Sequence, residues 1–397
     1  MNKKLYIIYR FYVFLIFILS MYPWFAWKLN TVYIYLLGIP LVTLLYTNNY
    51  CKRKSEDNLI IIASFFFFLW LGKTGNIYGL FEHFINWVIF VSVLTLKDDY
   101  KIDIIKFTTK WFSLLLLLSL AFYILYLIGI PLPNSRIVRD GYRSELSNYY
   151  FFVCFEGSMR FQSVFLEPGH MTMGLAPLLF INKYDIKKLP VLVMTMAQFF
   201  SFSLAGYLVF LFGFLYQSVL QKGKKSVLYP TAMISFFAIF LFASNYVFQA
   251  NLFKDLILSR MEWDGTSIVG DDRSSYYLDK QYDRYKQSSV AQFFTGIGYD
   301  GEKSEKGVSG YKFYMVSYGL IGLFLLIVFY YQAIAKRPRT RWDYGFLILM
   351  LLLLYQNSYP IWWCMLVSLS CGKVYMKYNE EEPIILADNK PSVAQHI

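Results

Sequence analysis

The segment from Arg160 to His170 holds the residues whose types and spacing are best suited to chemistry. It reads Arg-Phe-Gln-Ser-Val-Phe-Leu-Glu-Pro-Gly-His and is followed at once by an apolar run. The Pro-Gly pair favours a turn, so Glu167 and His170 should lie at the mouth of the helix that the apolar run forms. A carboxylate beside an imidazole at a desolvated mouth could act as a general base. The alternative is that Glu167 only caps the helix that starts near Gly169.

A second group of candidate residues is cationic. Arg273, Lys280 and Arg284 are spaced i, i+7 and i+11, which on a helix places them within about 40° of one another. Such a stripe suits a diphosphate, because arginine grips phosphate oxygens with two hydrogen bonds. The alternative is a solvated charged helix in which Asp279 and Asp283 pair with the stripe.

Another basic cluster precedes the Arg160 segment. Arg136, Arg139 and Arg143 are spaced i, i+3 and i+7. Pro133 and Gly141 disfavour a regular helix there, so the cluster is a weaker candidate for binding a phosphate.

Two further candidates are local motifs. Thr295-Gly296-Ile-Gly298 is a tight glycine turn before an apolar run, but a short GxG is common and specifies a phosphate cradle only weakly. Glu82 and His83 stand near the end of another apolar run. Ionisable groups inside a membrane segment are candidates for function, although these two are close to the predicted membrane interface.

The elements that must position these residues are apolar helices. Of the 397 residues, 57% are hydrophobic and 16% are charged, whereas soluble domains carry about 25% charged residues. The apolar residues form runs of about 15–20, the helix length that crosses ~30 Å of hydrocarbon. We therefore predict an all-α, polytopic integral membrane protein with about 12 transmembrane helices. The predicted spans are 5–26, 31–47, 58–71, 79–96, 111–130, 170–182, 189–201, 203–220, 227–247, 311–331, 343–358 and 361–376.

The placement of charge sets the predicted orientation. The net charge is +12, but Lys and Arg lie in short loops between apolar runs. This pattern orients membrane helices and argues against nucleic acid as a partner. With the N-terminus inside, the inner segments carry 20 basic residues and the four short outer loops carry two, Lys28 and Lys73. This count requires 189–220 to form two short helices, and it places both termini in the cytoplasm.

Two outer loops are long, 131–169 and 248–310, and nearly all candidate residues fall in them or at their ends. Long loops in a compact protein are usually functional or disordered. These loops are rich in Tyr, Arg, Asp and Glu, so we expect folded caps. The chain thus divides into a membrane domain, residues 1–378, and a polar cytoplasmic tail, residues 379–397, that we expect to be disordered.

Several familiar motifs are missing from the sequence. No CxxC or His/Cys cluster is present, so we expect no metal and no other cofactor. Without a Walker A motif or a DxD motif, neither an ATP motor nor a metal-bound nucleotide-sugar donor is indicated. The candidates converge on the outer face, where ATP and nucleotide sugars are not available. An enzyme there must use a donor that arrives activated, such as a lipid-linked diphosphate.

The motifs together resemble the Wzy-type polysaccharide polymerases, which are related to the O-antigen ligases. They are the Arg-x₆-Glu-Pro-Gly segment, Ser201-Phe-Ser-Leu-Ala-Gly206, the Gly-Ile-Gly turn after an Arg-containing loop, and the run 316–322. The resemblance covers residues 100–360 approximately. The chain departs from the family at Leu204, where an Arg is frequent. It also has eleven residues between Arg284 and Gly296, where the family has ten.

The resemblance implies a reaction. This family joins oligosaccharide units carried on undecaprenyl diphosphate at the outer face of the cytoplasmic membrane, and so makes O-antigen, capsule or exopolysaccharide. A sugar hydroxyl attacks the anomeric carbon of another unit without a metal, and arginines stabilise the departing diphosphate. Arg160 and Arg273 match the family's loop arginines, and Glu167 matches its carboxylate. Either Glu167 or His170 would be the base or the acceptor positioner.

The resemblance also implies partners: membrane lipid, the lipid-linked oligosaccharide, a flippase and a chain-length regulator. The remaining candidates would bind the diphosphate or the glycan. They are Arg136, Arg139, Arg143, Lys280, Arg284, Glu82 and His83.

Two other functions stay open. An O-antigen ligase would pass a finished glycan to a lipid or protein acceptor from the same type of donor. A flippase of lipid-linked sugar is an alternative of another class. A transporter should show paired repeats and charges near the bilayer midplane. The sequence shows no repeat and carries its charge in the outer loops, which favours an enzyme.

Overall fold

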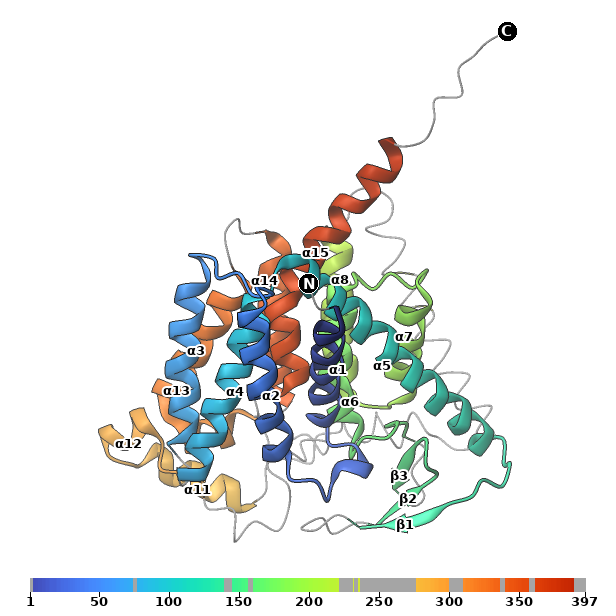
Figure 1. Cartoon of the computed structure of the whole chain (residues 1–397). Coiled ribbons are helices and arrows are strands. Elements are labelled where there is room, and N and C mark those ends of the chain that lie inside the picture. Colours follow the sequence, from blue (N-terminus) through green and yellow to red (C-terminus); the bar gives the residue numbers. More distant parts are fainter. Residues whose placement is uncertain are drawn as a thin grey trace.

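The chain folds into a bundle of helices with a small sheet at one end, as seen in the computed structural model (Figure 1). The structure describes residues 3–73, 77–138, 145–155, 160–220, 231, 235, 276–299, 310–335, 340–356 and 361–388. The candidates Arg139, Arg143 and Arg273 lie outside the described residues, as does nearly all of the predicted span 227–247.

The helices are α1 (Lys3–Leu19), α2 (Thr31–Thr47), α3 (Asp57–Gly72), α4 (Ile77–Thr95), α5 (Asp98–Leu127), α6 (Pro168–Ile181), α7 (Leu189–Phe200), α8 (Leu204–Leu220), α11 (Tyr276–Lys286), α12 (Val290–Thr295), α13 (Tyr311–Ile334), α14 (Arg341–Gln356) and α15 (Trp363–Asp388).

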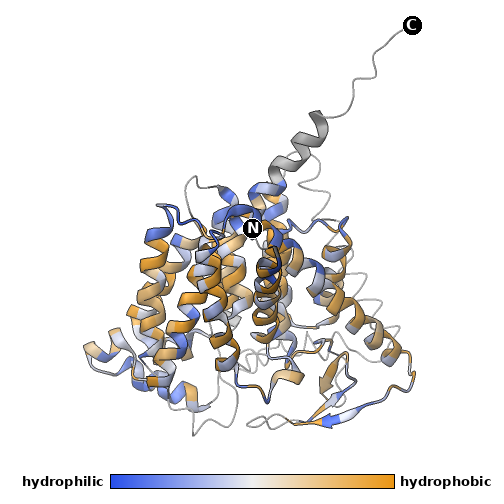
Figure 2. Ribbon diagram, viewed as in Figure 1, coloured by the Kyte–Doolittle hydropathy of each residue, from blue (hydrophilic) through white to orange (hydrophobic). Residues whose placement is uncertain are grey.

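Within the described residues, three helices are long and apolar enough to cross a membrane: α4, α5 and α13. The shorter helices α2, α3, α7 and α8 are also apolar. Apolar residues fill the middle of the bundle, and hydrophilic residues gather toward its two ends (Figure 2). The start of α1 and the end of α15 lie at one end, whereas the sheet, α11 and α12 lie at the opposite end (Figure 1).

The small sheet adds β structure to a chain predicted to be all-α. Its three strands, β1 (Ser135–Ile137), β2 (Leu146–Asn148) and β3 (Val153–Phe155), pair antiparallel in the order β1-β2-β3. The sheet belongs to the first long loop. Ser119 of α5 ties this loop to the bundle, since its hydroxyl donates to the Phe151 carbonyl at 2.6 Å.

The segment 189–220 forms two helices, as the charge pattern predicted. Helix α7 ends at Phe200 and α8 begins at Leu204. The side chain of Ser203 accepts the Gly206 N–H at 3.3 Å and so satisfies one amide at the start of α8. Gly206 also allows close packing, because a Cβ there would lie 2.8 Å from Thr172 Oγ1 of α6.

Two predicted boundaries were wrong. Helix α1 ends at Leu19, because Pro23 cannot continue a helix, and Trp24–Ala26 form a short 3₁₀ helix, η1. Helix α5 begins at Asp98, inside the predicted loop, because Asp98 and Asp99 favour a helix N-terminus. Helix α15 runs from Trp363 to Asp388 and includes Pro383.

Helix α6 lies at the centre of the bundle. Every residue from Met171 to Ile181 is buried, and α6 packs against α7, α8, α14 and α15. The segment that carries Arg160, Glu167 and His170 therefore leads into the most enclosed helix. A rigid, enclosed helix is a good support for side chains that must hold a fixed geometry.

Candidate active site at the start of helix α6

Glu167 occupies the N-cap position of α6, and Pro168 is the first helical residue. The Glu167 backbone is extended, and its carbonyl accepts the His170 N–H at 3.1 Å. Its side chain makes no capping hydrogen bond. Glu167 therefore stands at the N-cap position without capping α6 through its side chain.

His170 is held in a corner of aromatic rings. Its imidazole lies 5.6 Å from the Tyr22 ring and 4.9 Å from the Trp362 ring, between ring centroids. The rings of Tyr22 and Trp362 lie 5.5 Å apart, so the three rings contact one another. Tyr22 and Trp362 therefore fix the orientation of an imidazole, which a proton-transferring group requires.

Tyr22 reaches the site because its backbone turns sharply. Its φ of 55° is in the left-handed region, which is uncommon for a bulky residue. The Tyr22 carbonyl accepts the Leu166 N–H at 3.2 Å, and the Trp24 N–H donates to the Val164 carbonyl at 2.9 Å. The segment after α1 thus pairs with the segment before α6, and it sets the position of Glu167.

Arg160 lies at the other end of this segment, beside the turn between α7 and α8. The N–H of the next residue, Phe161, donates to the Phe200 carbonyl at 2.9 Å. Arg160 is half-buried and close enough to Tyr207 of α8 to act on its hydroxyl electrostatically. The structure therefore brings Arg160 into the enclosed part of the molecule, where a guanidinium acts more strongly on a ligand charge than at the surface.

Two adjacent tryptophans connect this site to helix α4. Trp362 contacts His170, and the Trp363 Nε1 donates to the Asn86 side chain at 2.9 Å. Asn86 in turn donates to the Glu82 carbonyl at 3.1 Å. The backbone of α4 at Glu82 is therefore linked through Asn86 to Trp363, the neighbour of Trp362.

His83 is the neighbour of Glu82 on α4. Its Nδ1 is buried and has no hydrogen-bond partner among the residues that the structure describes. Buried polar atoms are nearly always satisfied, so an exception calls for an explanation such as a bound ligand. His83 remains a candidate for contact with substrate.

Arg136 does not lie in this enclosed site. It is on β1, where its guanidinium pairs with Glu145 at 3.6 Å, and the two side chains are 70% and 55% exposed. An exposed ion pair of this kind contributes little to stability. Arg136 is thus placed at the rim of the molecule, available to the solvent.

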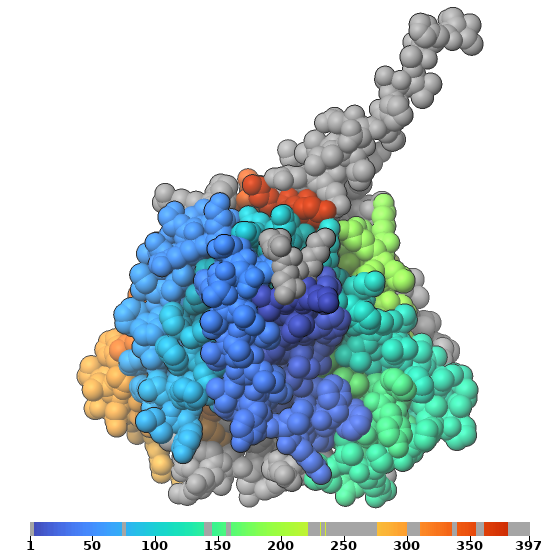
Figure 3. Space-filling model, viewed as in Figure 1, coloured from blue at the N-terminus to red at the C-terminus, as the bar shows by residue number. Residues whose placement is uncertain are grey.

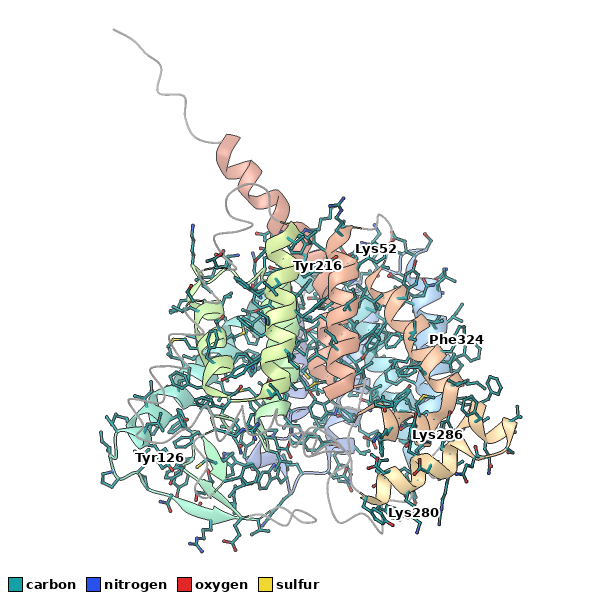
Figure 4. All side chains as sticks on the ribbon, turned by 180° about the vertical axis from the view of Figure 1, so that it is seen from behind. Lys52, Tyr126, Tyr216, Lys280, Lys286 and Phe324 are labelled. Carbon is teal, nitrogen blue, oxygen red and sulfur yellow. The ribbon has the colours of Figure 1, made fainter. Side chains whose placement is uncertain are left out.

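Helix α11 carries Lys280 and Arg284, and both are exposed. The neighbouring aspartates form ion pairs with lysines outside the predicted stripe. Asp279 pairs with Lys312 at 2.6 Å and Asp283 pairs with Lys286 at 2.8 Å. Figure 4 shows Lys280 and Lys286 at the end of the bundle opposite to Lys52.

The Gly-Ile-Gly turn is not a phosphate cradle, because protein carbonyls already take its amides. The Gly296 N–H donates to Gln292 at 2.7 Å. The N–H groups of Ile297 and Gly298 donate to the Val316 carbonyl at 2.9 and 3.1 Å. The turn instead joins α12 to α13.

This junction depends on a break in α13. Gly319 has a φ of 64° and a ψ of −168°, so the helix is interrupted there. The backbones approach closely, since a Cβ on Gly319 would come within 3.0 Å of the backbone of Gly296 and Phe294. Only glycine combines this φ with this lack of space. Trp70 of α3 also holds the break, as its Nε1 donates to the Tyr318 carbonyl at 2.9 Å.

No protein-family model, curated protein or solved structure matches this chain.

Glu167 is the N-cap residue and His170 lies on the first turn of α6, and the two are joined by the hydrogen bond from the His170 N–H to the Glu167 carbonyl. A carboxylate and an oriented imidazole can remove a proton from a hydroxyl group. Over the described residues, no group of three or more His, Cys, Asp or Glu side chains could hold a metal ion.

Proposed function

We propose that this protein is a multi-pass enzyme of the cytoplasmic membrane that polymerises lipid-linked oligosaccharides. The donor would be an oligosaccharide on undecaprenyl diphosphate, and the product would be O-antigen, capsule or exopolysaccharide. The observation that supports this best is the arrangement around the start of α6. There a carboxylate and an oriented imidazole lie at the end of the bundle that also carries the exposed cations of α11.

The proposed reaction transfers a glycosyl group. A hydroxyl oxygen of the acceptor unit forms a bond to the anomeric carbon of the donor, and the bond from that carbon to the diphosphate oxygen breaks. The diphosphate leaves with the bonding electrons, and Glu167 or His170 takes the hydroxyl proton. Arg160 and Arg273 stabilise the charge that grows on the leaving group.

The proposed topology has about 12 spans and both termini in the cytoplasm. The sheet, α11 and α12 would then lie at the end of the bundle that faces away from the cytoplasm. A reporter that is active only outside the cytoplasm tests this proposal. Fusion after Lys224 should give no signal, and fusion within 264–272 should give a strong signal. The reverse pattern would mean that 189–220 crosses the membrane as one span.

A transporter of the lipid-linked unit is the second candidate. The observation that favours it is the interruption of α13 at Gly319, because transporters commonly form their binding sites at broken helices. The interruption of α13 is also compatible with a polymerase, because the break at Gly319 lets the turn after α12 pack closely against α13.

One reaction separates the candidates. Purified protein is mixed with a lipid-diphosphate-linked oligosaccharide, with and without EDTA, and the products are resolved by size. We expect a ladder of polymer that survives EDTA. Movement of the substrate across vesicle membranes without a ladder would favour the transporter. If neither occurs but a glycan is transferred once a lipid or protein acceptor is added, the enzyme is a ligase.

A further inference from the structure

Helix α12 is unusually exposed for an apolar element. It begins with a capping box formed by Ser289 and Gln292, and none of its six residues is buried. Val290 is 75% exposed, Phe294 is 45% exposed and Phe293 is 36% exposed. Figure 3 shows the α11–α12 segment as a bulge on the flank of the molecule, beside α3 and α4. A short helix of this composition gains nothing from facing water.

The position of α12 is set by the ends of apolar helices. Lys73, directly after α3, donates from its ammonium group to the Thr295 carbonyl at the end of α12. The same ammonium lies 4.3 Å from the Trp70 ring centroid. On the other side, α12 packs against α13, which is one of the helices suited to crossing a membrane. Helix α12 therefore lies at the level where apolar helix surfaces end.

Exposed cations lie beside these apolar side chains. Tyr285 of α11 stacks on Phe293 with ring centroids 5.3 Å apart, and its hydroxyl donates to the Phe293 carbonyl at 2.7 Å. This contact fixes α12 to the helix that carries Lys280 and Arg284, both exposed. Aromatic side chains next to lysine and arginine are typical of segments that lie in a membrane surface.

We propose that α12 docks into the surface of the lipid bilayer. Val290, Phe293 and Phe294 enter the boundary between headgroups and acyl chains, and Lys280 and Arg284 lie at the phosphates of anionic lipids. This inference rests on the part of the proposed function that places the helix bundle in a membrane. Docked in this way, α12 holds α11 at the level where a lipid-linked diphosphate presents its charge.

Fluorescence quenching in vesicles tests the docking. The full chain carries Cys51→Ser, and the other three cysteines are buried. Phe294→Cys, Lys280→Cys or Phe324→Cys is labelled with an environment-sensitive dye. Phe324, 65% exposed on α13, reports on the bundle itself. Each variant is reconstituted in phosphatidylcholine with phosphatidylglycerol, with and without lipids brominated near the headgroup end of the acyl chains. The unlabelled parent protein gives the background.

We expect the dye at position 294 to be quenched several-fold more than the dye at position 280. Quenching at 324 without quenching at 294 would show that the docking proposal is wrong while the membrane placement stands. No quenching at position 294 or 324 would contradict the placement of the helix bundle in a membrane, and with it the proposed function. Quenching at 294 that appears only after a polyprenyl diphosphate is added would assign the surface to that lipid and overturn docking to the bilayer.

The charge contribution has its own control. Lys280→Glu with Arg284→Glu, or omission of phosphatidylglycerol, should reduce the quenching at position 294 and leave that at position 324 unchanged. Equal quenching at 294 with and without the anionic lipid would show that the cations of α11 take no part in docking.

Discussion

The imidazole of His170 lies edge-on against the indole of Trp362, with ring centroids 4.9 Å apart and an interplanar angle of 80°. The contact joins the first turn of α6 to the residue before α15. It also completes the aromatic corner that Tyr22 closes on the other side. An imidazole can take a proton only from a group toward which its ring is held. Trp362 is therefore a positioning residue for the proposed base, not a group that touches the reacting atoms.

Replacing Trp362 with leucine should lower the turnover rate about 100-fold while changing the KM for the lipid-linked donor little, because a displaced catalytic group costs rate. Trp362→Phe keeps an aromatic edge and should retain most of the rate. The assay is polymer formation at saturating donor, with folded protein measured by gel filtration. Trp111→Leu is the control, since Trp111 is 39% exposed and its ring packs on Phe107 of its own helix. A wild-type rate for Trp362→Leu would show that Trp362 does not position His170 for catalysis.

The break in α13 predicts a contrast between two glycines with positive φ. Gly319→Ala places a Cβ within 3.0 Å of backbone atoms that cannot move aside. It should destabilise the fold by about 3 kcal/mol or more. Gly298 has a φ of 80° but open space around it, so Gly298→Ala should cost only about 1–2 kcal/mol of backbone strain. Thermal unfolding in detergent compares the two, and equal losses would mean that the close approach at Gly319 is unimportant.

A buried ion pair joins α14 to α15. Lys373 Nζ lies 3.0 Å from an Asp343 oxygen, and the side chains are 21% and 2% exposed. Lys373→Met leaves a buried carboxylate without its cation and should destabilise the protein by about 3 kcal/mol. Glu145→Gln breaks the exposed pair with Arg136 and should cost less than about 1 kcal/mol. The two variants are compared by unfolding in detergent. Similar unfolding of both would show that burial does not strengthen the α14–α15 pair.

Arg273 lies outside the described residues, and its role is a prediction from the sequence and the proposed reaction. Arg273→Ala should abolish polymer while the protein level stays unchanged. Arg273→Lys should fail as well, because lysine cannot make two parallel hydrogen bonds to a diphosphate. Polymer is measured on a gel and protein by immunoblot. Arg53→Lys is a control expected to keep activity, because Arg53 donates to the Asn58 side chain at the start of α3. Full activity of Arg273→Lys would show that any positive charge suffices.

Much of the helix pattern could be predicted because apolar runs of helix length are local signals. The run 31–47 matches α2, and the break in 189–220 lies where small polar residues interrupt an apolar segment. Hydropathy does not detect polar helix ends, so the start of α5 was missed. The polar first turns of α5 are stabilised by tertiary contacts, such as the ion pair of Arg10 with Asp103 at 2.7 Å.

The site could be predicted only in part, because the sequence shows local signals but not contacts between distant segments. Pro168 and Gly169 mark the start of α6 locally, and they place Glu167 and His170 correctly. The contacts of His170 with Tyr22 and Trp362 join segments that are distant in the sequence, so no local pattern reveals them. The sequence indicated a phosphate cradle at the Gly-Ile-Gly turn only weakly, and no local pattern shows that a carbonyl of α13 accepts two of its amides.

Glu167→Gln separates the two interpretations of the carboxylate. Glutamine has nearly the same size and can occupy the N-cap position, so a purely structural role predicts an unchanged rate. If the carboxylate is the base, the rate should fall about 10²–10⁴-fold. The measurement is single-turnover transfer from a lipid-linked donor, with donor binding measured separately to show that it is intact. Glu167→Asp keeps the carboxylate and should recover part of the rate. A wild-type rate for Glu167→Gln together with an inactive His170→Asn would assign the proton transfer to His170, and the aromatic corner around that ring would then become the part of the site that controls catalysis.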